Sequence, residues 1–249
     1  IPNARSWGMF FEAGTRHLWF RAHFDEGKVM GLASYGAAHA EAWPIFDSST
    51  HVPSLDHVRW QAFLASRLSR APGEELLDDH VRFAAGLQRT YEEGLLGLAR
   101  WLRETTGCAR LVLSGGCALN CTANGRLAAA GIFDEVYVSP VPHDAGAAPG
   151  AAIHVAQERG EVLDLPVQPV PAWGPRYRAL DVEEAIDSLG WPTHTPQDIA
   201  VDVAQRLVAG KIGGWFSGRL EGGPRALGSR NIIADPRTTK IRDRVNLVK

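Results

Sequence analysis

Apolar side chains recur at every third or fourth position between Val81 and Thr106. They are Phe83, Leu87, Tyr91, Leu95, Leu98 and Leu102. This spacing places side chains on one face of an α-helix. The segment therefore predicts a long amphipathic helix, and Gly107 predicts its end because glycine readily adopts the left-handed conformation that closes helices.

A different pattern follows, in which short apolar runs alternate with helical segments rich in alanine. The expected elements are a strand at 110–113, a glycine turn at 114–116, a helix at 117–130, a strand at 135–138, a loop at 140–146 and a helix at 147–159. Such alternation predicts an α/β fold with a parallel or mixed sheet. Ligands of these sheets bind beyond the carboxyl ends of the strands. Gly115-Gly116 and His143-Asp144 are therefore expected to share one crevice.

The remaining segments divide the chain. Residues 37–80 are expected to form helices and loops. The segment 163–178 holds four prolines, a composition typical of a semi-rigid linker. We therefore expect one domain at 1–162 and a second at 179–249. The elements expected after the linker are helices at 182–189 and 199–209, a strand at 212–216 and a segment rich in glycine and arginine.

Composition limits the class of protein. The chain of 249 residues is 45% hydrophobic and carries a net charge of −2, so its charge does not predict a nucleic acid or a membrane as partner. No apolar run approaches the about 20 residues of a membrane span. Three cysteines in a chain of this length argue against a disulfide framework and for the cytoplasm. Because it starts at Ile1 and lacks a polar tail after Lys249, we expect a piece of a longer polypeptide.

The sequence SGGCALN follows the first strand of the alternating region. Gly115 and Gly116 let the backbone approach a ligand and turn its N–H groups toward it. The following helix adds its positive end, and Asn120, expected one turn into that helix, can hydrogen-bond a base or a ribose. The pattern predicts a phosphate or nucleotide site. A tight turn between strand and helix is the alternative.

Asp144 in the sequence HDAG is a candidate ligand for a divalent metal, since carboxylate oxygens suit such ions. It is equally placed to cap the helix that begins at Ala147. Cys117 and Cys121 lie on one helix face without a CxxC partner, which favours apolar packing over a thiolate metal site.

Two further segments carry charged candidates. In EGKVMGLASYG, Lys28 can reach a phosphate and Glu26 can orient a hydroxyl, with an exposed charged turn as the alternative. In GRLEGGPRALGSR, Arg219, Arg225 and Arg230 stand among several glycines. Guanidinium groups bind phosphates and carboxylates in bidentate fashion, so this segment predicts an anion site, with solvated arginines as the alternative.

Taken together and in this order, EGKVMGLASYG, LSGGCALNCTANGRL, VSPVPHDAGAAPGAA and GWFSGRLEGGPRALGSRNIIADPR resemble the O-carbamoyltransferases that modify nodulation factors and antibiotics. The resemblance covers nearly the whole chain and is weakest over residues 37–80. It implies the C-terminal half of an actin/chaperone-ATPase/sugar-kinase-like domain, followed by part of an α/β adenylate-forming domain that resembles threonylcarbamoyl-AMP synthase.

The resemblance also implies a reaction. ATP and carbamoyl phosphate form carbamoyl-adenylate, and a domain with a bound divalent metal, usually iron with magnesium as the other option, passes the carbamoyl group to a hydroxyl of a small molecule. The implied residues are Gly115, Gly116 and Asn120 for the adenylate, Glu26 and Lys28 for the same pocket, Asp144 for the metal, and Arg219, Arg225, Arg230 and Lys249 for the phosphates and substrate.

This chain lacks one part of the family pattern, the His-x-x-x-His pair of metal ligands. The missing N-terminal half of the enzyme, or a partner chain, is expected to supply it. Two other functions remain open. One is a threonylcarbamoyl-type transferase acting on tRNA, which the near-neutral charge disfavours. The other is a non-catalytic nucleotide-binding fragment or subunit.

Overall fold

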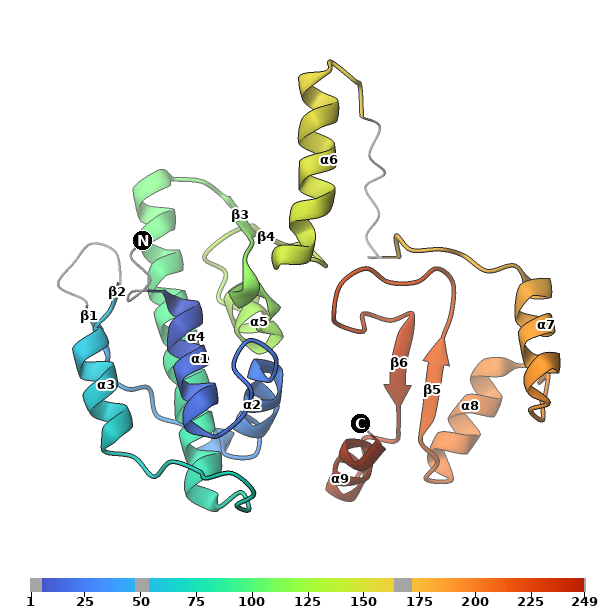
Figure 1. Cartoon of the computed structure of the whole chain (residues 1–249), viewed down its shortest axis with the longest axis horizontal. Helices are drawn as coiled ribbons and strands as arrows, with labels where there is room; N and C mark the ends of the chain where they lie inside the picture. The colour runs from blue at the N-terminus through green and yellow to red at the C-terminus, as the bar shows by residue number, and fades with distance from the viewer. Residues whose placement is uncertain (1–5, 48–53, 164–171, 249) are drawn as a thin grey trace. The chain divides into compact units, whose positions relative to one another are not determined.

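The computed structural model describes residues 6–47, 54–163 and 172–248. By internal contacts the chain divides into two compact units, Ile1–Ala147 and Ala148–Lys249, and Figure 1 colours them from blue to red along the chain. The expected linker at 163–178 stays a prediction, because residues 164–171 lie outside the described ranges.

The first unit is mainly helical. Its elements are α1 (Trp7–His17), α2 (Glu26–Ala33), the 3-10 helix η2 (Ala37–His39), β1 (Phe46–Asp47), β2 (Ser54–Leu55), α3 (His57–Ala65), α4 (Asp78–Thr106), β3 (Arg110–Leu113), η3 (Gly116–Leu119), α5 (Cys121–Ala129), β4 (Glu135–Val138) and η4 (Asp144–Gly146). Strands β1 and β2 pair antiparallel. The two expected strands of the alternating region and the helix predicted at 81–106 are thus present.

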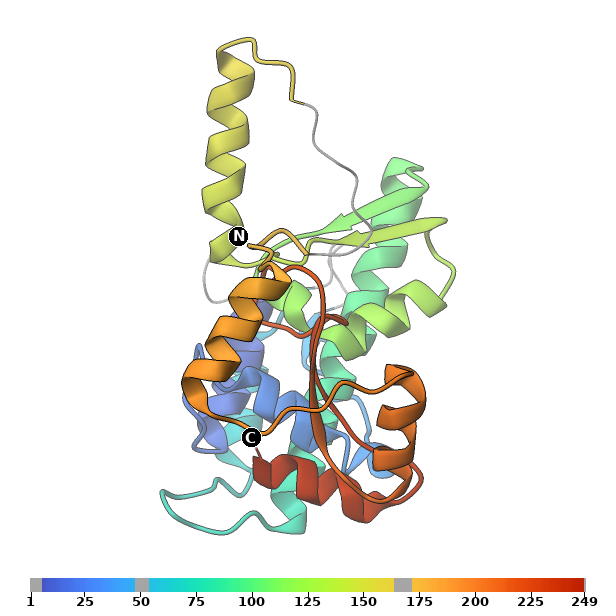
Figure 2. The ribbon, with the colours of Figure 1, turned by 90° about the vertical axis from the view of Figure 1, so that its right-hand side faces the viewer.

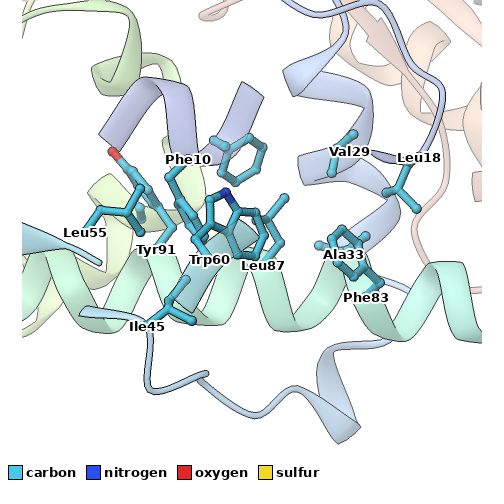
Figure 3. Packing of buried hydrophobic residues seen from close by; sticks show 13 residues of the cluster. Phe10, Leu18, Val29, Ala33, Ile45, Leu55, Trp60, Phe83, Leu87 and Tyr91 are labelled. Atoms are coloured by element: carbon cyan, nitrogen blue, oxygen red, sulfur yellow. The ribbon is translucent and has the colours of Figure 1, made fainter. Parts of the chain in front are cut away.

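Helix α4 forms the centre of this unit. Asp78 and Asp79 lie in its first turn, where carboxylates interact favourably with the helix dipole. Gly107 ends the helix in the left-handed conformation, with φ 68°. Side chains of α1, α2 and α3 pack on the apolar face of α4, and Figure 3 shows Phe10, Trp60 and Leu87 gathered there. Burial of this face supplies most of the driving force for folding.

Strands β3 and β4 pair in parallel, with Arg110 opposite Glu135 and Leu113 opposite Val138. The two strands run side by side in Figure 2. A second apolar cluster joins α4, α5 and the connection to β4 through Leu96, Ala99, Leu127 and Phe133. A parallel pair joined by a helix confirms the mixed α/β architecture.

Two expectations in the first unit were wrong. The helix predicted at 117–130 begins only at Cys121, because Gly116–Leu119 forms a 3-10 turn and Asn120 caps the helix. Residues 37–80 were expected to form helices and loops, yet Phe46–Asp47 and Ser54–Leu55 also pair as short strands. For Glu26 and Lys28 the alternative of an exposed charged turn does not hold, because their segment forms helix α2. Val29 and Ala33 of α2 are buried against the core, so tertiary packing decides the conformation of a segment with two glycines.

The second unit contains helices α6 (Ala147–Glu158), α7 (Ala179–Leu189), α8 (Ile199–Val208) and α9 (Thr239–Val248), with strands β5 (Gly213–Phe216) and β6 (Arg230–Ile233). The two strands pair antiparallel, with Phe216 opposite Arg230. Strand β6 was not predicted, because its short run has no alternation of apolar and polar residues. Across the described ranges of the chain, no helix is long and apolar enough to cross a membrane.

Candidate functional site

The loops that follow β3 and β4 are joined directly. The N–H of Gly115 donates to the carbonyl oxygen of Pro142 at 2.6 Å, and the Ser114 hydroxyl donates to the same oxygen at 3.4 Å. The backbone angle φ of Gly115 is 93°, a value that residues other than glycine rarely adopt. The expected adjacency of the SGG turn and the HDAG loop at one edge of the sheet is therefore present.

Asn120 lies at the N-cap of α5, not one turn into the helix as expected. Its Oδ1 accepts from the N–H of Ala123 at 3.1 Å and from Nε2 of Gln88 at 3.0 Å, and its Nδ2 donates to Oε1 of Gln88 at 2.8 Å. The paired amides fix the start of α5, and with it the SGG turn, on α4. A contact of Asn120 with a nucleotide stays a prediction.

A polar network continues this contact between α4 and α5. Gln88 donates to Glu92 at 2.7 Å, and the Arg126 guanidinium lies 2.6 Å from Glu92 and 3.0 Å from Glu93. Hydrogen bonding to Arg126 holds the pKa of Glu93 below its usual value. The sequence analysis did not find this network. The sequence nevertheless contains an indication of this network. Gln88 and Glu92 directly follow the core residues Leu87 and Tyr91, which places them at the border of the apolar face of α4.

Cys117 contributes to the core beneath the SGG turn. The Tyr91 hydroxyl donates to its carbonyl oxygen at 3.3 Å, and Cys117 packs against the main apolar cluster. Burial raises the pKa of the Cys117 thiol, and burial also raises that of Tyr91. The position of Cys117 against this cluster agrees with the expected apolar packing.

Asp144 is exposed and begins the short helix η4. The part of the chain that the structure describes contains no group of three or more His, Cys, Asp or Glu side chains arranged to hold a metal ion. The described residues therefore do not fit a metal site by themselves, and the ligand role of Asp144 stays a prediction. Nδ1 of the neighbouring His143 is buried and has no hydrogen-bond partner among the described residues.

Glu26 and Lys28 lie in the first turn of α2 and make local contacts with the connection that precedes it. The Glu26 carboxylate accepts from the N–H of His23 at 2.7 Å, and the Lys28 ammonium lies 2.9 Å from the buried carboxylate of Asp25. The hydrogen bond from Lys28 lowers the pKa of Asp25. These contacts stabilise the start of α2, and a role of either residue in a ligand pocket stays a prediction.

The Gly/Arg loop, residues 217–229, connects β5 and β6 in the second unit. Glu221 is buried at its centre and accepts hydrogen bonds from the backbone N–H groups of Leu227 at 3.0 Å and Ser229 at 2.7 Å. The Arg230 guanidinium pairs with Glu221 at 3.4 Å and donates to the carbonyl oxygens of Gly223 at 2.5 Å and Arg225 at 3.3 Å. Sequence reasoning missed Glu221.

The other two arginines of this segment are held differently. Nε of Arg219 donates to the carbonyl oxygen of Gly174 at 2.9 Å, and the residue is exposed. Nε of Arg225 is buried and has no hydrogen-bond partner among the described residues. Nε of Arg230 is likewise buried without a hydrogen-bond partner, but Nη2 of Arg230 is bonded, whereas the Arg225 side chain has no ion pair or hydrogen bond among the described residues. Lys249, the third cation assigned to phosphate binding, lies outside the described residues.

Comparison with known proteins places these features in a family. The model of the carbamoyltransferase N-terminus matches residues 1–153, and that of the carbamoyltransferase C-terminus matches residues 204–249. Nodulation protein NolO of Bradyrhizobium diazoefficiens is 37% identical over all of this chain, which spans 46% of that relative. Nodulation protein NolNO of Sinorhizobium fredii is 36% identical over all of this chain, which spans 38% of it.

A further relative, the 3'-hydroxymethylcephem-O-carbamoyltransferase of Streptomyces clavuligerus, is 32% identical over 90% of this chain and 42% of its own length. The chain therefore spans less than half the length of these relatives. Because the N-terminal family model alone covers more than half of the chain, and the C-terminal model follows it in the expected order, the chain belongs to the carbamoyltransferase family.

Proposed function

We propose that the protein to which this chain belongs is an ATP-dependent O-carbamoyltransferase that acts on a hydroxyl of a small-molecule natural product. The observation that carries the proposal is the presence of both carbamoyltransferase models, in order, on one chain. The name of the cephem relative describes carbamoyl transfer to a hydroxymethyl group. The same class of acceptor is proposed for this protein.

Within this proposal the two units have separate tasks. The first supplies the second half of an actin-like domain, in which the SGG turn and α5 bind the adenylate through Gly115, Gly116 and Asn120. The second supplies part of an adenylate-forming domain, in which the Gly/Arg loop binds phosphates. The parallel pair β3–β4 with its glycine turn, and the Arg225 guanidinium, whose buried Nε has no hydrogen-bond partner among the described residues, support this assignment.

The chemistry follows from the balance of atoms. Pyrophosphate leaves ATP only if an oxygen of the carbamoyl fragment attacks the α-phosphorus. Carbamoyl phosphate must therefore first lose its phosphate to water, which leaves carbamate. The carbamate oxygen then forms carbamoyl-adenylate and releases pyrophosphate. Finally the acceptor hydroxyl attacks the carbamoyl carbon, loses its proton to a base, and AMP leaves. Arg225 would offset the charge that develops on a departing phosphate.

A divalent metal would polarise the carbamoyl carbonyl or the attacking hydroxyl. The described residues do not provide its ligands, so no step is assigned to it here. The remainder of the enzyme, or a partner chain, is the proposed source of the metal ligands and of part of the acceptor site. Neither a nucleic acid nor a membrane is proposed as a partner, since the chain carries a net charge of −2.

The test uses the full-length protein and measures exchange of labelled pyrophosphate into ATP. We expect exchange that depends on carbamoyl phosphate and falls at least about 100-fold in Arg225→Ala, the usual loss for one preorganised charge-stabilising donor. Arg237→Ala is the matched control, because Arg237 is exposed and paired with Asp235. Absence of exchange in the unaltered protein would favour a non-catalytic module. Transfer of labelled carbamoyl to tRNA instead of a small hydroxyl compound would favour the threonylcarbamoyl-type alternative.

A further inference from the structure

Glu221 is the one buried residue among the described residues of the second unit, with 3% of its surface exposed. Glutamate is rarely buried unless its charge is paired. The apolar side chains of this unit are at least partly exposed across the same described ranges. The buried carboxylate therefore marks the most closely packed point of the unit, and it lies within the Gly/Arg loop.

The contacts of Glu221 join the two ends of this loop. Its Oε1 accepts from backbone N–H groups six and eight residues further along the chain, at Leu227 and Ser229. Its Oε2 faces the Arg230 guanidinium at 3.4 Å. The two hydrogen bonds to Oε1 are charge-assisted and therefore stronger than neutral ones, whereas Oε2 and Nε of Arg230 form an ion pair without a hydrogen bond. One carboxylate thus fixes the returning arm of the loop and the first residue of β6.

Arg230 carries this constraint to the tip of the loop. Its Nη2 donates to the carbonyl oxygens of Gly223 and Arg225. Arg230 therefore fixes the backbone at Arg225, and with it the point from which the Arg225 side chain extends. The charge of Arg230 is opposed by Glu221. The charge of Arg225 is not opposed by an ion pair among the described residues, and its Nε has no hydrogen-bond partner there.

We propose that Glu221 is a positioning residue, which acts through Arg230 to hold the backbone of residues 223–229 so that the Arg225 guanidinium binds a phosphate-bearing substrate. The nature of the anion rests on the proposed function, and the positioning role rests on the contacts. Arg230 then belongs to the support of the site, whereas Arg225 is its ligand. This division separates two arginines that stand five positions apart in the sequence.

Two effects on Glu221 oppose one another. Burial acts to raise the pKa of this carboxyl, but the N–H groups of Ser229 and Leu227 and the charge of Arg230 outweigh burial, and the pKa lies below its ordinary value. Glu221 is therefore ionised at neutral pH. In Glu221→Gln the shape is retained, but Arg230 loses its counter-charge and the side-chain amide can present N–H groups to another donor.

Whether Glu221→Gln strengthens or weakens anion binding distinguishes a positioning role of Glu221 from a purely electrostatic effect of its charge. Removal of a negative charge close to an anion site strengthens anion binding if only Coulomb forces act. If Glu221 positions the loop, the same substitution weakens binding. We expect Glu221→Gln to weaken binding of inorganic pyrophosphate to the full-length protein by about tenfold or more, since breaking a buried ion pair from one side is costly.

Calorimetric titration with inorganic pyrophosphate tests this in Glu221→Gln, Arg230→Gln, the double variant and Arg225→Ala. The double variant should bind no more weakly than the weaker single variant, because residues acting as one unit are not additive. Arg225→Ala should abolish measurable binding, and the control Arg237→Gln should bind as the unaltered protein does. If Glu221→Gln does not fold, Arg230→Lys replaces it, since lysine keeps the charge but loses the guanidinium fork.

Tighter or unchanged binding in Glu221→Gln, or unchanged binding in Arg230→Lys, overturns the proposal. So does additive loss in the double variant, which would make Arg230 an independent ligand, or absence of pyrophosphate binding in the unaltered protein. The two proposals fail separately. Binding that responds to Glu221→Gln without any ATP–pyrophosphate exchange contradicts the proposed function alone, whereas exchange that is insensitive to Glu221→Gln contradicts the positioning role alone.

Discussion

Arg126 is one of the residues that tie α5 to α4, and its replacement by methionine tests how firmly the helix after the SGG turn is held. The guanidinium contacts Glu92 at 2.6 Å and Glu93 at 3.0 Å. The Glu92 side chain is 7% exposed and that of Arg126 is 31% exposed. In Arg126→Met the Glu92 carboxylate would keep only its hydrogen bond from Gln88, at 2.7 Å, among the contacts between described residues.

The expected cost follows from the burial of the two partners. Removal of one partner from a fully buried ion pair costs about 3–5 kcal/mol. Because the guanidinium retains partial contact with water, we expect less, about 2–3 kcal/mol. Methionine preserves most of the apolar stem of arginine, so lost packing adds little. A matched control is Arg89→Met, because Arg89 pairs with Glu93 at 2.8 Å with 42% and 37% of the side chains exposed; this pair is worth at most about 0.5 kcal/mol.

Hydrogen exchange of the backbone amides of α4 and α5 is the suitable assay, because it reports local opening within a longer protein. Arg126→Met should lower the opening free energy of α5 by about 2–3 kcal/mol, several times the effect of Arg89→Met. Adding Glu92→Gln to Arg126→Met should restore part of the loss, since the uncompensated charge is then gone. Equal effects of Arg126→Met and Arg89→Met, or no recovery in the double variant, would refute the reasoning.

Two further predictions concern the core of the first unit. In a urea titration, Gly86→Ala should lower the free energy of unfolding by about 1–3 kcal/mol despite the better helix propensity of alanine, because the added Cβ would clash with the Trp43 ring. In the same titration Gly31→Ala, with nothing within 4 Å of its Cβ, should raise it by up to about 1 kcal/mol. Burial lowers the pKa of His17, although its ring also hydrogen-bonds to Leu68. The resulting stability is full above the unfolded pKa of about 6.5 and is lost as pH falls through the folded pKa; His17→Gln should therefore flatten the pH dependence of unfolding below about pH 6.5, and an unchanged slope would contradict this.

The periodicity of apolar residues predicted a helix or strand correctly where the pattern in the sequence matches the face that is buried in the structure. The apolar stripe on α4 and the runs that form β3 and β4 are visible in the sequence because each buries one face. The 3-10 turn before α5 was not visible, since Asn120 caps the helix only through its place beside Gln88 on α4. Strand β6 likewise depends on its pairing with β5, a contact between segments separated by the Gly/Arg loop.

The site residues show the same limit. Glutamate in a Gly-rich segment is ordinarily exposed, so nothing in the local sequence marks Glu221 as buried. Its burial depends on N–H donors and a guanidinium that the loop returns to it six to nine residues later. Conversely, Glu26 and Lys28 were candidates for a ligand site because they are charges beside a glycine. In the structure Glu26 accepts a hydrogen bond from His23, and Lys28 forms an ion pair with Asp25.

The distribution of ion pairs in the second unit explains why a chain with a net charge of −2 can present an anion site. Arg178 and Arg206 are paired with aspartates within four residues in the sequence, and these local pairs neutralise them. In the Gly/Arg loop and the first residue of β6, three arginines face a single glutamate, and Arg230 takes up that glutamate. Positive charge is therefore left at Arg219 and Arg225, and of these two Arg219 is exposed and donates to the carbonyl oxygen of Gly174. A net charge near zero does not predict a broad nucleic-acid surface, but it has no bearing on the proposed binding of one phosphate by a single guanidinium among glycines.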